Sequence, residues 1–183
     1  MIQLLIFAIG SVFFIYVSRK TLFRFRSHGF YRFFAWEAIL VLVLLNFPYW
    51  EKDPFSPHQL ISWLFLVISL FLVIHGVLLL KSIGKPNENR PDTELLAFEK
   101  TTTLVTVGAY KYIRHPLYSS LLFLAWGVFL KQPTSLPGLL LVLTASLFLL
   151  LTAKSDEYEC LQYFGSVYQT YMLGTKRFIP FLF

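Results

Sequence analysis

The chain has 183 residues, enough for one domain, and its composition is far from that of a soluble protein. Hydrophobic residues make up 56% of it and charged residues only 14%, against about 25% charged residues in a typical soluble domain. A soluble helix needs a polar face for water, so this composition excludes an ordinary soluble domain and indicates helices that face lipid.

Five nearly uncharged stretches follow one another along the chain, interrupted only by Glu37 and His75. They cover residues 2–17, 33–47, 61–80, 117–130 and 136–153. Crossing ~30 Å of hydrocarbon takes about 20 helical residues, so the third and fifth stretches are long enough and the second and fourth are short. Short spans must include flanking residues or tilt less than their neighbours.

No ten-residue alternation typical of a membrane β-barrel is visible. We therefore expect an all-α, polytopic membrane helix bundle with about five transmembrane helices, formed by residues 1–183 as a single domain. We expect the first stretch to be a retained span, because no basic region precedes it and no small-residue cleavage site follows it.

Basic residues are distributed unevenly over the connections between these stretches. The first and third connections and the C-terminal segment hold 14 of the 16 lysines and arginines, and the other two connections hold only Lys52 and Lys131. The positive-inside rule then predicts an N-terminus outside and a C-terminus in the cytosol. The net charge of +6 indicates attraction to anionic lipid headgroups. Charges that flank spans do not form the soluble basic face of a nucleic-acid-binding protein.

A few isolated polar residues need an explanation. Cys160 is the one cysteine, so it can form no internal disulfide, and we expect it to pack in the structure. His75 lies within a span and needs a partner inside the bundle. Glu37 lies near the predicted cytosolic end of the second span, where a helix N-terminus favours a carboxylate. No constellation of metal ligands is apparent, so we expect no metal site.

The longest polar segment joins the third and fourth stretches, over residues 81–116. It begins KSIGKPNENRPD, which has the glycine, prolines and asparagines of a loop. Its second half, LVTVGAYKYIRHP, supplies apolar anchors that favour an ordered segment. Pro116 suits the first turn of the fourth helix, where its missing backbone donor has no cost.

The fifth helix is predicted to extend beyond the membrane. Residues 139–164 contain no glycine or proline, and Gly165 is a suitable C-terminal cap. In this extension Asp156 and Glu159 share one helix face, while Glu157 lies on another. An amphipathic stretch, VYQTYM, follows and ends at Gly174, and the final FIPFLF is apolar enough to return to the membrane interface.

A basic, aromatic segment and an acidic segment thus meet at the predicted cytosolic mouth of the bundle. Spacing alone leaves two interpretations open. Arg114, His115, Asp156 and Glu157 could form a salt-bridge network that fixes the loop to the helix. They could also form a functional site, since ionisable groups beside a membrane cavity often have a function.

Two sequence motifs resemble those of one enzyme family. Residues 104–120, LVTVGAYKYIRHPLYSS, resemble the LVxxGxYxxxRHPxYxG signature of the isoprenylcysteine carboxyl methyltransferase family, integral membrane enzymes that use S-adenosylmethionine. Residues 156–180, which begin DEYECLQYFGSVYQTYM, resemble that family's second signature, EExxLxxxFGxxYxxYxxxxxRxIP. The two signatures occur in the family's order and cover about the C-terminal half of the chain.

The resemblance implies a membrane-embedded S-adenosylmethionine-dependent methyltransferase that acts on a lipophilic acceptor and forms S-adenosylhomocysteine. Arg114 would bind the donor's carboxylate and Glu157 its ammonium group. Tyrosine rings suit adenine stacking or the sulfonium cation. The implied catalytic residues are Arg114, His115 and Glu157, and the implied cofactor-binding residues are Tyr110, Arg114, His115, Tyr118, Asp156, Glu157 and Tyr168.

Three positions depart from the family's pattern. Asp156 replaces a glutamate, Ser120 replaces the closing glycine of the first signature, and Ala109 stands where proline is common. A serine at a close backbone approach could shift the cofactor's position. The acceptor therefore stays open among a prenylated cysteine carboxylate, a phospholipid amine and other hydrophobic molecules.

Two other classes of protein compete with this interpretation. A membrane reductase of the sterol type has similar RHPxYxG-like runs and binds NADPH, although such chains are longer and have more spans. A non-catalytic membrane protein could retain the same pocket as a contact for a small molecule or a protein. Serine at position 120 is the feature that favours this last alternative.

Overall fold

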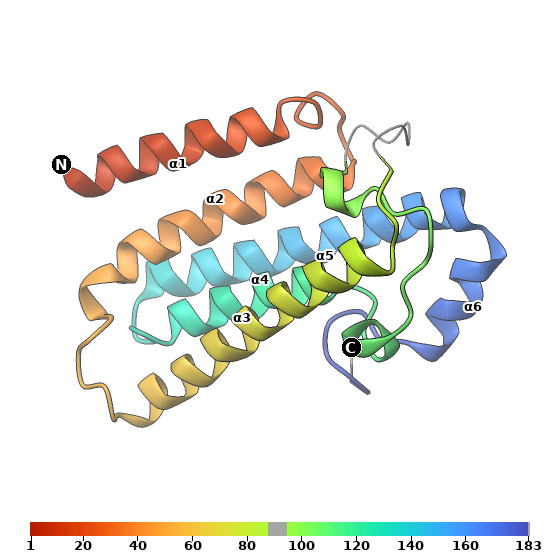
Figure 1. The fold of residues 1–183 in the computed structure, drawn as a ribbon. Helices are drawn as coiled ribbons and strands as arrows, with labels where there is room; N and C mark the ends of the chain where they lie inside the picture. Colours follow the sequence, from red (N-terminus) through yellow and green to blue (C-terminus); the bar gives the residue numbers. More distant parts are fainter. Residues whose placement is uncertain (88–94, 183) are drawn as a thin grey trace.

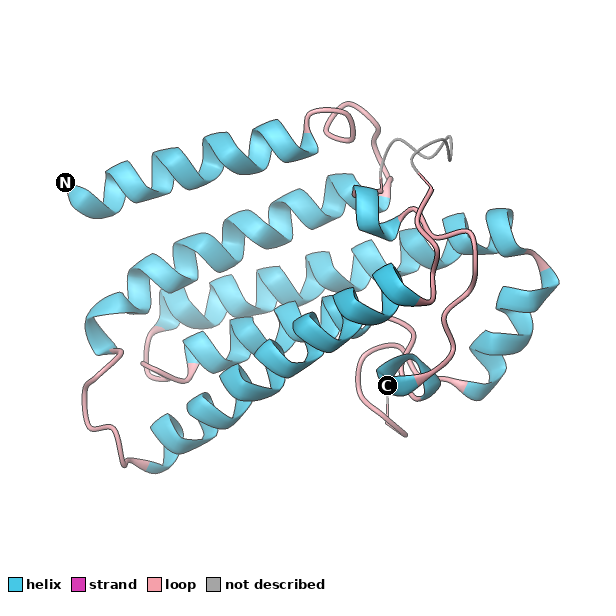
Figure 2. Ribbon diagram, viewed as in Figure 1, coloured by secondary structure: helices cyan, strands magenta, loops and turns pink. Residues whose placement is uncertain are grey.

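The computed structural model describes residues 1–87 and 95–182, and helices form the framework of that part of the chain (Figure 1). The described residues contain no strand beyond isolated bridges (Figure 2). The elements are α1 (Ile2–Ser18), α2 (His28–Asn46), η1 (Phe47–Tyr49), α3 (Pro57–Ser82), η2 (Ala97–Glu99), η3 (Gly108–Lys111), α4 (Pro116–Phe129), α5 (Leu136–Phe164) and α6 (Ser166–Gly174). The all-α prediction is confirmed.

Three helical segments are long and apolar enough to cross a membrane, namely His28–Tyr49, Pro57–Ser82 and Leu136–Phe164. The apolar helices α1 and α4 are shorter, with 17 and 14 residues. α2 begins five residues before the apolar stretch predicted from residue 33, because the Ser27 side chain caps it by accepting a hydrogen bond from the Phe30 N–H at 3.2 Å. The count of five spans stays a prediction.

The helices pack as two close pairs, α2 with α5 and α3 with α4, which are joined through α4 and α5. α1 lies along α2 on the outside of the bundle (Figure 1). Small residues at the crossings allow the backbones to approach closely. Ala35 in α2, Ala125 in α4 and Ala145 and Ala153 in α5 are fully buried.

The end of α5 turns sharply into α6 at Gly165, so that α6 folds back at one end of the bundle (Figure 1). Gly165 has φ +59°, a conformation that glycine adopts without steric cost. The predicted helix end at Gly165 and the predicted second helix up to Gly174 are both confirmed. The chain then returns toward the start of α4, which brings residues 175–178 beside residues 112–115.

The predicted loop that begins at Lys81 starts slightly later, because α3 continues through Ser82. Part of that predicted loop falls on residues 88–94, which lie outside the described residues. Thr102 and Thr103 donate backbone hydrogen bonds to the Gly84 carbonyl, so the described flanks of this segment lie side by side.

Lys131 lies at the opposite end of the bundle. The sequence indicated only a basic residue of a connection, but the structure buries this side chain. The residue is only 1% exposed, and its ammonium group lies 3.7 Å from the centroid of the Trp63 ring. Its Nζ donates to Gln59 Oε1 at 2.9 Å, and Gln59 in turn donates to the carbonyls of Tyr49 and Lys52. This lysine ties the connection between α2 and α3 to the end of α4.

Candidate functional site

A cavity opens at the end of the bundle that carries α6. It contains about 800 Å³ of empty space, open solvent at its mouth included. Its apolar lining residues are Leu80, Leu95, Leu104, Val105, Leu117 and Phe164. Its other lining residues are Glu99, Thr101, Tyr110, Arg114, His115, Tyr118, Asp156, Glu159, Cys160, Tyr168 and Tyr171.

Gly108 brings the first signature against α3. It has φ +59°, and a Cβ at this position would lie 2.5 Å from His75 Nε2. His75 accepts a hydrogen bond from the Ala109 N–H at 3.3 Å and stacks on Phe71. The histidine within the span therefore has the partner that its position required, and this contact holds η3 so that Tyr110 reaches the cavity.

The two signatures are joined by backbone pairing. The Arg114 N–H donates to the Lys176 carbonyl at 2.7 Å, and the His115 N–H donates to the Arg177 carbonyl at 3.2 Å. Ser119 Oγ donates to the Phe178 carbonyl at 2.9 Å, and Phe178 is buried. The C-terminal segment is thereby fixed along the RHP segment.

Glu157 is the centre of a buried ion-pair network. Its carboxylate accepts a hydrogen bond from Arg114 Nε at 2.9 Å, and from Arg177 Nε and Nη2 at 3.0 and 2.7 Å. His115 Nε2 lies 3.4 Å from the same carboxylate. Arg114 Nη1 donates to the carbonyl of Thr175 and, at 3.3 Å, to that of Met172. These contacts tie the first signature, α5 and the C-terminal segment together.

Six of the seven residues implied by the resemblance line the cavity, and Glu157 does not. We expected Glu157 to bind the donor's ammonium group, but in this structure its carboxylate is committed to Arg114 and Arg177. The physical reason is helix periodicity. Asp156 and Glu159 share the α5 face that lines the cavity, whereas Glu157 points to the C-terminal segment.

Asp156 contacts His115, Tyr118 and Cys160. Its Oδ2 lies 3.4 Å from His115 Nδ1, and its Oδ1 accepts a weak contact from Cys160 Sγ at 3.6 Å. Burial lowers the pKa of His115, but hydrogen bonds to Asp156 and Glu157 outweigh burial and hold that pKa above its usual value. A cationic imidazole is thus favoured between two carboxylates.

Four tyrosines, Tyr110, Tyr118, Tyr168 and Tyr171, line the cavity beside this charged group. Tyr171 Oη donates to the Tyr110 carbonyl at 2.6 Å and so holds α6 against η3. Burial raises the pKa of Tyr110, Tyr168 and Tyr171, so all three stay neutral. Neutral phenol rings in a buried wall can stack on a flat ring or face a cation.

A second buried ion pair at the cavity was not foreseen from the sequence. Arg32 in α2 donates through Nη1 to both carboxylate oxygens of Glu99, at 2.8 and 3.1 Å. Glu99 lines the cavity and also accepts a hydrogen bond from the Leu96 N–H. Arg32 is one of several basic residues in the first connection, and Glu99 belongs to no recognised motif, so no sequence pattern predicts that they pair. Their pairing depends on a contact across 67 positions of the sequence.

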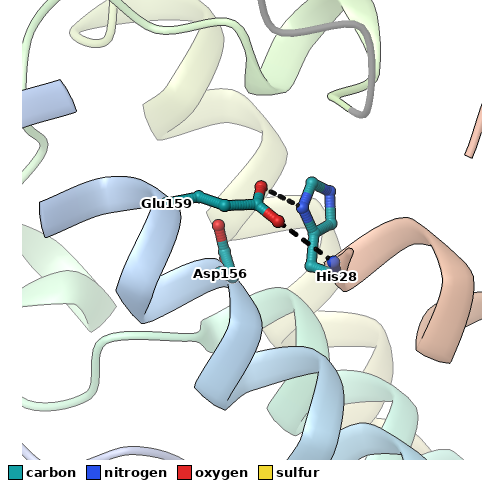
Figure 3. Close-up of side chains that lie close together, drawn as sticks. All are labelled: His28, Asp156 and Glu159. Carbon is teal, nitrogen blue, oxygen red and sulfur yellow. Dashed lines mark hydrogen bonds and ion pairs between the residues drawn. The ribbon is translucent and has the colours of Figure 1, made fainter. Parts of the chain in front are cut away.

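A third group, His28, Asp156 and Glu159, could offer one nitrogen and two carboxylate oxygens to a cation (Figure 3). These atoms lie within 4.8 Å of one another. Glu159 accepts hydrogen bonds from His28 Nδ1 at 2.6 Å and from the His28 N–H at 3.1 Å. Two of the three possible ligands, His28 and Glu159, therefore already bind each other.

The remaining predictions concern three single residues. Ser120 is buried and donates to the Leu117 carbonyl at 2.7 Å, and it is not among the described residues that line the cavity. Cys160 is half-buried and lines the cavity, where its Sγ contacts Asp156. Glu37 accepts a hydrogen bond from Ser11 at 2.8 Å, which joins α1 to α2 away from the cavity.

Comparison with known proteins supports the resemblance to this family. Over 124 residues the chain is 30% identical to a probable protein-S-isoprenylcysteine O-methyltransferase of Oryza sativa subsp. indica. The protein of the same description from Oryza sativa subsp. japonica matches to the same extent. The matched part is 66% of this chain and spans 63% of the length of each relative. No family model and no solved structure matches.

Proposed function

We propose that this relative of the isoprenylcysteine carboxyl methyltransferases is an integral membrane methyltransferase that uses S-adenosylmethionine and a lipophilic acceptor. The observation that carries the proposal is the cavity in which the two signatures meet, with Arg114, Asp156 and buried tyrosines among its lining residues. The donor would supply a methyl group on a sulfonium, which is electrophilic without a metal.

The polar lining residues fit the charges of such a donor. Among the described residues, Arg114 has no partner for Nη2, since its contacts use Nε and Nη1. We propose that Nη2 binds the donor's carboxylate and that Asp156 binds the ammonium group, the role first given to Glu157. Tyr110 and Tyr168 would face the adenine or the sulfonium. Tyr118 stacks on His115 with ring centroids 5.3 Å apart and would hold that imidazole in place.

The chain's own contribution to the reaction would be alignment and exclusion of water. The apolar lining residues would hold the acceptor's chain and the polar lining residues the donor, so the cavity would align the two and exclude water from the reacting atoms. Arg114, His115 and Glu157 would act mainly by keeping this geometry, with Arg114 also touching the donor.

The test is calorimetric titration of the detergent-purified protein with S-adenosylhomocysteine. We expect saturable binding that Asp156→Asn weakens by about 10-fold or more, since a hydrogen bond to a charged group contributes about 1.5–3 kcal/mol. Glu51→Gln, at an exposed position of the opposite end, is the control and should bind as the parent protein does. Binding of NADPH in place of S-adenosylhomocysteine would support the reductase, and binding of neither would contradict the proposal.

A further inference from the structure

The turn between α1 and α2, residues 19–27, is strongly basic. Its exposed basic residues are Arg19, Lys20, Arg24 and Arg26. No aspartate or glutamate occurs in the chain before Glu37. Among the described residues, the side chains of Lys20 and Arg26 form no hydrogen bond or ion pair. The turn therefore presents concentrated positive charge that its own sequence does not neutralise.

Two phenylalanines are exposed on the same turn. Phe23 is 86% exposed and Phe25 is 80% exposed. The ring centroid of Phe25 lies 5.4 Å from that of Phe30, which lies 5.0 Å from that of Phe34 in α2. Phe34 is itself exposed, on the segment His28–Tyr49 that is long and apolar enough to cross a membrane. The aromatic surface of this candidate span thus continues into the basic turn.

Contacts with the bundle fix the shape of the turn. Thr21 is buried, and its Oγ1 donates to the Ser18 carbonyl at 2.9 Å. Gly29 lies so close to Thr21 that a Cβ there would be 2.6 Å from the Thr21 methyl group. Arg26 has φ +73°, which is uncommon for a residue with a side chain, and its carbonyl accepts a hydrogen bond from Ser155 in α5. The charges and rings are therefore held in one arrangement.

The position of the turn indicates what can bind to it. It directly precedes His28, the first residue of the candidate span, so we place it at the depth of the lipid headgroups (Figure 1). Aromatic rings are favoured at that depth, and clustered basic residues beside a membrane helix attract anionic lipids. A zwitterionic headgroup carries a cation beside its phosphate, so it fits a purely basic turn less well. An acidic macromolecule in solution would match the charge but would leave Phe23 and Phe25 in water.

We propose that residues 19–27 form a binding site for an anionic phospholipid. Lys20 and Arg26 bind the headgroup phosphate, and the rings of Phe23 and Phe25 lie among the upper parts of the acyl chains. This lipid is neither the donor nor the acceptor of a methyl group. The inference therefore goes beyond the proposed methyltransferase function and does not depend on it.

The test compares two lipids with the same acyl chains, dioleoylphosphatidylglycerol and dioleoylphosphatidylcholine. Their binding to the full chain in detergent micelles is measured by native mass spectrometry. We expect the anionic lipid to bind at least about 10-fold more tightly, because several basic residues at the surface each favour it. Higher salt should reduce this preference, since salt screens exposed charges.

The double variant Lys20→Gln/Arg26→Gln removes two charges from the turn and keeps long polar side chains. We expect the preference for phosphatidylglycerol to fall about 5-fold or more, the effect of at least one basic residue near a membrane surface. Phosphatidylcholine affinity and the unfolding temperature should stay within error of the parent protein. Lys81→Gln/Lys176→Gln, which removes two exposed charges outside the turn, is the matched control and should keep the preference.

Three results would overturn this inference. One is equal affinity of the parent protein for the two lipids, which decides the question even if the double variant is unstable. Another is an equal loss of preference in the turn variant and in its control, which would mean that net charge alone attracts the lipid. The third is displacement of the lipid by inorganic phosphate or by an oligonucleotide, which would indicate a general anion site.

Discussion

Among individual residues, two neighbouring acidic side chains that point in different directions define the site. Asp156 lines the cavity, while Glu157 neutralises Arg114 and Arg177 behind it. A buried carboxylate between two guanidinium groups is difficult to replace, because its removal breaks two ion pairs away from water. The two residues should therefore respond differently to substitution.

Glu157→Gln should destabilise the fold more than it changes the chemistry of donor binding. Loss of the charge removes the carboxylate that Arg114 and Arg177 share, and breaking a buried pair costs about 3 kcal/mol. Thermal unfolding in detergent should show a clearly lower midpoint for Glu157→Gln than for Asp156→Asn. The opposite order would mean that Glu157 is not the structural centre of this network.

His115 should make stability depend on pH. Its folded-state pKa lies above the usual value, so its protonation contributes stability fully below about pH 6.5, the unfolded value. That contribution is lost as pH rises through the folded-state pKa. The unfolding midpoint of the parent protein should thus fall more steeply than that of His115→Gln over this range. Parallel pH profiles would exclude a cationic His115 in the folded protein.

Among the helices and their connections, α5 and the segment before α4 together form the site, and glycine permits the packing of that segment. η3 lies against α3 because Gly108 has a positive φ and no Cβ where His75 and Leu79 pack. Gly174, at the end of α6, has an ordinary φ, and none of the described residues lies within 4 Å of the place that a Cβ would take there. The two glycines thus differ in environment, although each lies at one end of a helical segment.

Gly108→Ala should be strongly unfavourable, while Gly174→Ala should be nearly neutral. Alanine at Gly108 combines an unfavourable φ with a contact of 2.5 Å to His75 Nε2, so we expect a loss of more than about 1 kcal/mol. Tyr110 should then leave its position, and S-adenosylhomocysteine affinity should fall with it. Unfolding and calorimetry of both variants measure this. A stable, binding-competent Gly108→Ala protein would show that η3 does not position the cavity wall.

The bundle as a whole has two chemically different ends. One end carries the cavity and most of the arginines, and the other carries the buried Lys131 with its aromatic neighbours. We propose that the cavity faces the cytosol, with the N-terminus outside, because basic residues concentrate at the connections on that side. A soluble, charged donor would then reach the cavity from water and the acceptor from lipid.

Single-cysteine labelling tests this orientation. In a Cys160→Ser background, Glu51→Cys should react with a membrane-impermeant maleimide added outside intact cells, and Lys20→Cys should react only after permeabilisation. Both positions are exposed in the structure, so access depends on the side of the membrane. The reverse pattern would invert the topology.

Local sequence was enough to predict a bundle of apolar helices, the ends of α5 and α6, and the two segments that form the site. These features depend on hydropathy, on glycine at a helix end and on helix periodicity, which a linear pattern records. The spacing placed Asp156 and Glu159 on one face of α5, but it did not indicate that this face, rather than that of Glu157, lines the cavity.

The pairing of charges, by contrast, followed from the packing of distant segments. Glu157 lies next to Asp156 in sequence, yet its partners Arg114 and Arg177 lie 43 and 20 positions away. Arg32 with Glu99 and His28 with Glu159 are likewise brought together by packing of α2 on the rest of the bundle. A carboxylate binds a ligand or a neighbour according to which cation lies within reach, and no linear pattern records that distance.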